Sequence, residues 1–374
     1  MQEGEGASVS AGGSPMLRHL AQRIAAAGGW LPFDRYMHEA LYAPGLGYYA
    51  RGERMFGQLP PMGTKPGSDF VTAPELSPLF GRALAAQVAQ ALQATGTDEV
   101  WEFGAGSGAL AAELLGSLGE RVRRYHVVDV SAGLRQRQAA RLQPWGDRVA
   151  WLDALPPRMQ GVLVGNEVLD AMPVPLLHYD GERWLERGVV LQGDHLAWED
   201  RPTALRPPAE RGRFLPGAVT EVHPQAEAFV RTLADRLQRG AAFFIDYGFP
   251  EHEYYHPQRH GGTLMCHRGH VADTDPLADP GAKDITAHVN FSAIALAAQD
   301  AGLQVLGYTS QARFLLNCGL PALLAAADVR AQVAAQPLLL EHEMGELFKV
   351  IGFAAAATPF DAIGFAAGDR SHTL

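Results

Sequence analysis

An acidic residue followed by alternating glycines is the part of this sequence best suited to chemistry. Glu102 precedes Gly-Ala-Gly-Ser-Gly at 104–108, which lies between a short apolar run at 99–101 and an apolar helical pattern at 109–115. Glycines let the backbone turn tightly and approach a ligand closely, and the N-terminus of a helix offers free N–H donors. Asp129 ends the next apolar run, about 20 residues later, where nucleotide-binding βαβ units place a ribose-binding carboxylate. The pattern therefore predicts a site for an adenosine-containing cofactor.

Two kinds of cofactor fit this turn. Gly104, Gly106 and Ala109 match the relaxed dinucleotide fingerprint, so a nicotinamide- or flavin-binding oxidoreductase is one alternative. The G-x-G-x-G alternation, the acid just before it and a turn too short for a pyrophosphate favour S-adenosylmethionine instead. We expect the turn to hold the methionine part of this cofactor and Asp129 to bind the ribose hydroxyls. The residues expected to contact S-adenosylmethionine, or the product S-adenosylhomocysteine, are Glu102, Gly104, Ala105, Gly106, Gly108, Asp129, Asp153 and Asn166.

Composition limits the class of protein. The chain has 374 residues, of which 47% are hydrophobic, which is enough for one large or two moderate globular domains. Its formal charge is 31 − 41 = −10, so it lacks the basic field that nucleic-acid binding requires. The two cysteines, Cys266 and Cys318, suit a reducing compartment. No apolar run reaches membrane-spanning length and the first six residues are acidic, so we expect no membrane association and a cytoplasmic location.

The order of predicted elements indicates an α/β protein. Strand and helix patterns alternate from residue 98 to about 172, resume with a helix at 224–238, and end with a strand pair near 303–308 and 348–353. A final strand pair after a run of βα units suits a seven-stranded methyltransferase sheet. The expected organisation is a disordered leader (1–13), a helical N-terminal cover (14–97), the catalytic domain (98–353) with an antiparallel insertion (174–222) and a site-covering loop (247–290), and a loose tail (354–374).

Four predicted strand ends carry polar residues. They are the segment 102–108, Asp129, Asn166 with Glu167, and Asp246 with Tyr247. Each alone could be a turn or cap residue. Ligands of doubly wound sheets bind at the carboxyl ends of the strands, so the four together predict one shared ligand site.

A family resemblance extends this interpretation over most of the chain. The matching segments, in family order, are Phe33-x-x-Tyr36-Met37-x-x-Ala40-Leu41-Tyr42, Gly47-Tyr48-Tyr49, 67–75, Leu79-Phe80-Gly81, the glycine turn, Asn166-Glu167-x-x-Asp170-Ala171-x-Pro173, Ile245-Asp246-Tyr247-Gly248 and 284–291. The sequence thereby resembles the MidA-like family of S-adenosylmethionine-dependent methyltransferases, which includes a mitochondrial complex I assembly factor that methylates arginine. Asp129 and Asn290 depart from the family, which often has Glu at the first position and an acid at the second.

The resemblance implies a class I, Rossmann-like methyltransferase fold and a protein arginine as the acceptor, with a respiratory-complex subunit as a candidate partner. Guanidinium is a poor nucleophile because it is protonated and delocalised. Carboxylates on two of its nitrogens would localise the charge and leave the third nitrogen more nucleophilic. Glu167 and Asp170 would share one face of a helical turn, and Glu75 is a candidate third acid. The structural alternative is that Asp170 caps a helix and Glu167 is solvated.

Further residues are expected on the acceptor side of the site. They are Tyr48, Tyr49, Asp246, Tyr247, His270, Asp284 and His288. His252, His256, His260, His267 and Cys266 crowd the same region, but its prolines and glycines indicate a loop and no paired zinc motif accompanies them. We therefore expect no metal.

The sequence also bears on other acceptors and roles. The Pro-Pro pairs and the cysteines lack the flanking residues of amino-directed and cytosine-C5 DNA methyltransferases. A cofactor-binding assembly factor with weak or absent transfer is an alternative of a different class. The acceptor protein, the methylation state of the product and the oligomeric state are not encoded in these patterns.

Overall fold

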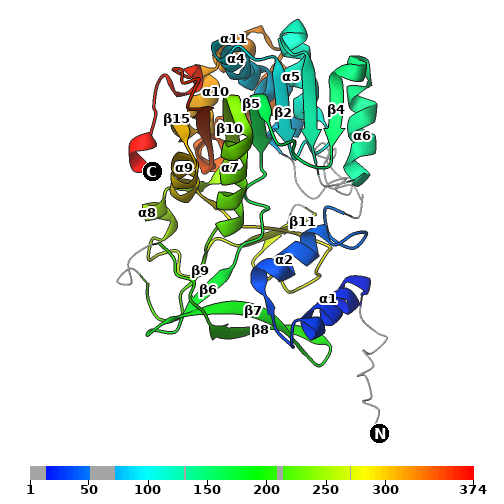
Figure 1. Cartoon of the computed structure of the whole chain (residues 1–374), viewed down its shortest axis with the longest axis vertical. Coiled ribbons are helices and arrows are strands. Elements are labelled where there is room, and N and C mark those ends of the chain that lie inside the picture. Colours follow the sequence, from blue (N-terminus) through cyan, green and yellow to red (C-terminus); the bar gives the residue numbers. More distant parts are fainter. Residues whose placement is uncertain (1–13, 51–71, 130–131, 209–213, 270) are drawn as a thin grey trace.

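The computed structural model describes residues 14–50, 72–129, 132–208, 214–269 and 271–374. Figure 1 shows a large sheet flanked by helices above a smaller lobe. The central path of the main sheet has the strand order β15-β16-β10-β5-β2-β3-β4. These strands are β2 (Glu99–Phe103), β3 (Arg124–Val128), β4 (Val149–Leu152), β5 (Met159–Asn166), β10 (Leu237–Phe249), β15 (Leu303–Ser310) and β16 (Phe348–Ala355).

The direction of these strands defines the class of fold. β10, β5, β2, β3 and β4 are parallel, whereas β16 is antiparallel to both β10 and β15. A two-residue eighth strand, β14 (Val289–Asn290), pairs in parallel with the last two residues of β10. The seven expected strands are thus present, and the sheet is an α/β class I methyltransferase sheet.

Helices cover both faces of the main sheet, which explains why the central strands are apolar throughout. Val162, Leu163 and Val164 in β5 are fully buried, as is typical of a parallel strand packed on both sides. One face carries α4 (Pro78–Thr95), α5 (Ala109–Leu118), α10 (Gln311–Asn317), α11 (Leu320–Ala326) and α12 (Val329–Ala335). The other carries α7 (Pro224–Arg236) and α9 (Phe291–Asp300), and α6 (Ala132–Leu142) contacts α5.

The smaller lobe combines two segments that are far apart in the sequence. Its antiparallel sheet pairs β1 (Leu31–Pro32) with β7 (Trp184–Gln192), so the N-terminal segment and the insertion at 174–222 form one unit. The other strands of this sheet are β6 (Leu176–Tyr179), β8 (His195–Pro202) and β9 (Val219–Glu221). Helices α1 (Pro15–Ala26) and α2 (Phe33–Tyr42) contribute to the hydrophobic core of this lobe.

The N-terminal cover is shorter than the sequence predicted. α4 was expected within the cover at 14–97, but it packs against α5, β5 and β10. Ser77 caps its N-terminus, and Leu79, Phe80, Leu84 and Val88 are buried in the core of the main sheet. An apolar helix of 18 residues needs a large surface to bury its face, and the main sheet provides it.

The described part of the segment 247–290 contains helix and strands and is not a simple loop. It contains α8 (Glu251–Tyr254) and a small antiparallel sheet of β11 (Met265–Arg268), β12 (Val271–Asp273) and β13 (Asp284–Thr286). The buried carboxylate of Glu221 anchors it by accepting hydrogen bonds from the Tyr254 hydroxyl at 2.9 Å and the Thr263 N–H at 2.8 Å. Strands of three or four residues show too little alternation to be recognised from sequence.

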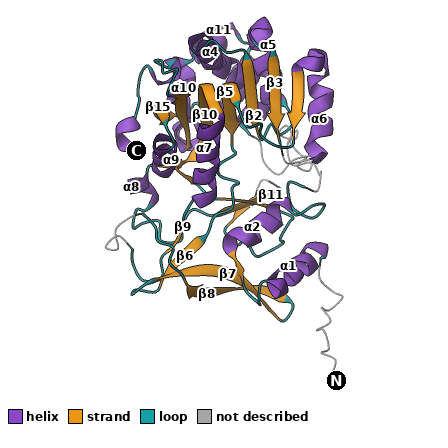
Figure 2. Ribbon diagram, viewed as in Figure 1, coloured by secondary structure: helices purple, strands orange, loops and turns teal. Residues whose placement is uncertain are grey.

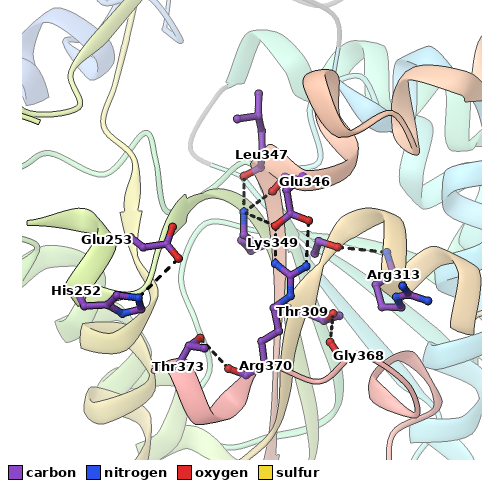
Figure 3. Close-up of polar contacts among 11 residues, drawn as sticks. His252, Glu253, Thr309, Arg313, Glu346, Leu347, Lys349, Gly368, Arg370 and Thr373 are labelled. Carbon is purple, nitrogen blue, oxygen red and sulfur yellow. Dashed lines mark hydrogen bonds and ion pairs between the residues drawn. The ribbon is translucent and has the colours of Figure 1, made fainter. Parts of the chain in front are cut away.

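The segment 354–374, expected to be a loose tail, packs against the main sheet. The ring of Phe365 lies against Gly307 and Gly352, where an added Cβ would come within 2.1 and 2.6 Å of it. Arg370 forms a two-pronged ion pair with Glu346, at 2.5 and 3.2 Å (Figure 3). The backbone N–H of Arg370 donates to the carbonyl of Tyr308 at 2.6 Å. The expectation was wrong because the glycines that admit this ring lie on distant strands.

We expect Phe365→Ala to lower the free energy of unfolding by about 3 kcal/mol, because it leaves a cavity against two glycine-lined strands. Urea denaturation followed by circular dichroism measures the change. Val329→Ala, at a side chain that is 73% exposed, is the control and should alter stability little. Equal stability of the two variants would mean that the C-terminal segment does not contribute to the folded core.

Candidate active site

A cavity of about 960 Å³ lies at the carboxyl ends of the main-sheet strands. Figure 2 shows the arrowheads of β2 and β3 pointing toward the smaller lobe. The cavity is lined by the turn after β2 and the end of β5, and from the other side by α2, β11 and the residues near β13. The site therefore lies between the two parts of the fold.

The glycine turn forms one wall of this cavity. Gly104, Gly106 and Gly108 have φ values of 62°, 53° and 82°, a region that side chains other than glycine rarely adopt. A Cβ on Gly104 would come within 3.1 Å of Val168. Gly104, Ala105 and Gly106 line the cavity, whereas Gly108 caps α5 just behind it. The backbone of this turn can therefore be approached closely by a ligand, as a cofactor-binding turn requires.

Two of the expected cofactor acids flank this turn. Glu102 is buried and accepts a hydrogen bond from the Tyr125 hydroxyl at 2.6 Å. Burial raises the pKa of Glu102 to about 8. Gln138 donates to Asp129 at 2.8 Å and to the carbonyl of Gly106 at 3.0 Å, which fixes Asp129 beside the turn.

The other two expected cofactor contacts differ in position. Asn166 lines the cavity at the end of β5. Asp153 does not: its side chain is 85% exposed and pairs with Arg135 at 2.5 Å. β4 is the edge strand of the sheet, so the residue after it can point away from the cavity.

The acids after β5 line the cavity, but not on a helix. The helical turn expected for Glu167 and Asp170 is absent, since bends and turns follow Asn166. Glu167 has a φ of 55°, which is strained for a residue other than glycine. Asp246, behind the cavity wall, holds this turn by accepting from the N–H groups of Leu169 at 2.9 Å and Val168 at 3.1 Å. Asp246 therefore supports the site instead of lining it.

Burial raises the pKa of both acids. Asn166 donates to Glu167 at 2.8 Å, yet burial, followed by the charge of Asp170, raises the pKa of Glu167 to about 8. Asp170 accepts a hydrogen bond from the Tyr247 hydroxyl at 2.5 Å, and burial raises its pKa to about 6. A cation entering the cavity would favour the ionised form of both groups.

The acceptor-side candidates come mainly from the smaller lobe. The Tyr49 hydroxyl donates to Asp284 at 2.9 Å, and both residues line the cavity, whereas Tyr48 is buried in the core of the lobe. His288 lines the cavity, stacks on Phe249 and donates from Nδ1 to the carbonyl of Thr263 at 3.3 Å. Burial lowers the pKa of His288 to about 4, so it is neutral at pH 7. His270 lies outside the described residues.

Glu75, expected as a third acid for the acceptor, lies at the glycine turn. It accepts hydrogen bonds from the Ser107 hydroxyl and from Arg141, the second at 3.3 Å. Its carboxylate therefore contacts the wall of the cavity that the glycine turn forms.

Sequence reasoning missed several lining residues. Tyr42, which donates to the carbonyl of Ala171 at 2.9 Å and stacks on Tyr49, was noticed only within the family motif. The apolar residues Phe229, Met344, Leu347 and Phe348 also line the cavity. Apolar side chains at a cavity carry no sequence signal that separates them from core residues.

The cavity is strongly acidic. The side chains with carboxyl groups that line it are Glu75, Glu102, Asp129, Glu167, Asp170 and Asp284. Within the described ranges, no lysine or arginine belongs to the lining.

No three His, Cys, Asp or Glu side chains of the described chain come together as a metal-binding group. Likewise, none of the described helices is both long and apolar enough to cross a membrane.

The parallel strands, the antiparallel β16, the glycine turn after β2 and the acid after β3 together define a class I methyltransferase. Residues 83–309 match the family described as "Putative S-adenosyl-L-methionine-dependent methyltransferase". The chain belongs to this family, and its cofactor is S-adenosylmethionine. The nicotinamide alternative is therefore not retained.

Individual relatives support this assignment. A Burkholderia thailandensis protein, solved with S-adenosyl-homocysteine bound, is 53% identical, with a TM-score of 0.90 and 96% of each chain covered. The zebrafish (Danio rerio) protein arginine methyltransferase NDUFAF7, mitochondrial, is 30% identical over 89% of this chain and 85% of its own. The human protein of the same name is 30% identical over 86% of this chain and 75% of its own.

Proposed function

We propose that this methyltransferase modifies an arginine side chain of a protein. The observation that supports this most directly is the pair Glu167 and Asp170, a half-buried and a buried carboxyl group in a cavity lined by six acids. A guanidinium group would supply the missing positive charge, and its planar N–H donors suit two carboxylates. The names of the 30% identical relatives point to the same acceptor.

The residues of the chain can position such an acceptor. When bound, S-adenosylmethionine supplies a methyl group on a sulfonium and leaves as S-adenosylhomocysteine. Glu167 would bind the guanidinium and accept the proton that the methylated nitrogen loses, since the pKa of Glu167 is raised to about 8. Asp170, held by Tyr247, would bind beside it. Tyr49 and Asp284 would border the acceptor from the smaller lobe.

The test uses methyl-tritiated S-adenosylmethionine, the purified protein and a lysate from cells that lack it, separated into protein, RNA and small-molecule fractions. We expect label in a discrete protein band, on arginine after hydrolysis, and respiratory-complex subunits are the first candidates to examine. Label confined to RNA or small molecules would overturn the acceptor but not the enzyme. No label, with S-adenosylhomocysteine still bound, would favour the assembly-factor alternative.

A further inference from the structure

Three polar side chains from separate elements meet at the glycine turn. Glu75 comes from the short helix α3 (Ala73–Leu76), Ser107 from the turn itself and Arg141 from α6. The Ser107 hydroxyl donates to Glu75, and Arg141 donates to both Ser107 and Glu75. Glu75 and Ser107 line the cavity, and the Glu75 side chain is only 8% exposed. An ion pair therefore lies at the wall where the methionine part of the cofactor is expected.

The two charges of the Glu75–Arg141 ion pair can be compared with the charges of the cofactor. The amino-acid end of S-adenosylmethionine carries both an ammonium and a carboxylate. The backbone N–H groups of the turn can bind the carboxylate, and a positively charged side chain would stabilise it further, yet the described lining of the cavity contains no lysine or arginine. The other acids flanking the turn, Glu102 and Asp129, cannot serve a carboxylate. Arg141 can bind the carboxylate, because its guanidinium donates hydrogen bonds to two residues of the cavity wall.

We propose that Glu75 and Arg141 form a clamp for the zwitterionic end of the cofactor. Arg141 binds the carboxylate, Glu75 binds the ammonium, and Ser107 holds the two side chains against the turn. Each charge of the cofactor then meets its opposite, and the cofactor charges extend the existing ion pair instead of breaking it. This role replaces that of a third acid for the acceptor, and it does not depend on the acceptor being arginine.

Three ligands that differ only at this end test the clamp by isothermal titration calorimetry. S-adenosylhomocysteine carries both charges, decarboxylated S-adenosylhomocysteine keeps the ammonium, and 5′-methylthioadenosine has neither. We expect Arg141→Ala to weaken S-adenosylhomocysteine at least tenfold and to change the other two less than twofold. Glu75→Gln should weaken both ligands that carry the ammonium and spare 5′-methylthioadenosine.

Arg135→Ala is the matched control, because Arg135 lies on the same helix, is equally exposed at 41% and pairs with Asp153 away from the cavity. It should leave all three affinities unchanged. Arg141→Lys, which keeps the charge, should recover part of the lost affinity. The proposal is overturned if Arg141→Ala weakens the three ligands equally or leaves S-adenosylhomocysteine unaffected. No acceptor is present in this assay, so its outcome is independent of the proposed function.

Discussion

Glu167→Gln is expected to lower the rate of methyl transfer at least 100-fold, while the dissociation constant of S-adenosylhomocysteine changes less than about threefold. The amide keeps the size of the side chain and can still accept the hydrogen bond from Asn166, so the turn after β5 should persist. What is lost is the negative charge that would bind guanidinium and the oxygen that would accept its proton. Labelled transfer and calorimetry on the same preparation measure the two effects.

The pH dependence of this reaction follows from the raised pKa of Glu167. In the free protein this group ionises only as the pH rises toward about 8, so kcat/KM should increase with pH up to that value. The bound acceptor cation favours the ionised form, so the corresponding rise in kcat should occur at lower pH. Glu167→Gln should lose the rise in kcat/KM. A wild-type profile that is flat between pH 6 and 8 would contradict this role.

The substitution Asp170→Asn distinguishes between two roles of this side chain, binding of the acceptor and support of the local backbone. If Asp170 binds the acceptor, transfer should fall at least tenfold with normal binding of S-adenosylhomocysteine. If it serves only to hold its turn through Tyr247, the transfer rate should be unchanged in a protein that remains folded. Asp153→Asn, on the exposed side chain outside the cavity, should have no effect in either assay.

The sequence could place the strand ends but not the partners of the side chains there. The glycine turn, Asp129 and Asn166 were located because strand ends of a parallel sheet share one edge, and this depends only on topology. The helical turn at Glu167 was wrong because Asp246, nearly 80 residues away, holds the backbone in another conformation. Glu75 is likewise paired with Arg141, a distant residue that no motif connects to it. Local patterns define elements, whereas long-range contacts decide how the polar side chains are used.

Gly104→Val is expected to weaken the binding of S-adenosylhomocysteine at least 100-fold, which corresponds to about 2.7 kcal/mol. Two effects combine. The backbone φ of 62° is strained for a β-branched residue, and the new side chain would begin 3.1 Å from Val168 while projecting at the cofactor cradle. Gly104→Ala, with a single methyl group, should fall between the wild type and Gly104→Val. Adding Val168→Ala should recover the part of the loss that is due to the contact, but not the part due to strain.

Gly146→Val provides the control for backbone strain alone. Gly146 also has a positive φ, of 51°, but an added Cβ there meets no atom within 4 Å, and the residue does not line the cavity. This variant should lose stability and retain its affinity for S-adenosylhomocysteine. If Gly104→Val bound the ligand as tightly as Gly146→Val does, the turn after β2 would not be the cofactor cradle. A selective loss at Gly104 would instead show that the shape of this backbone, and not its flexibility alone, is what the cofactor requires.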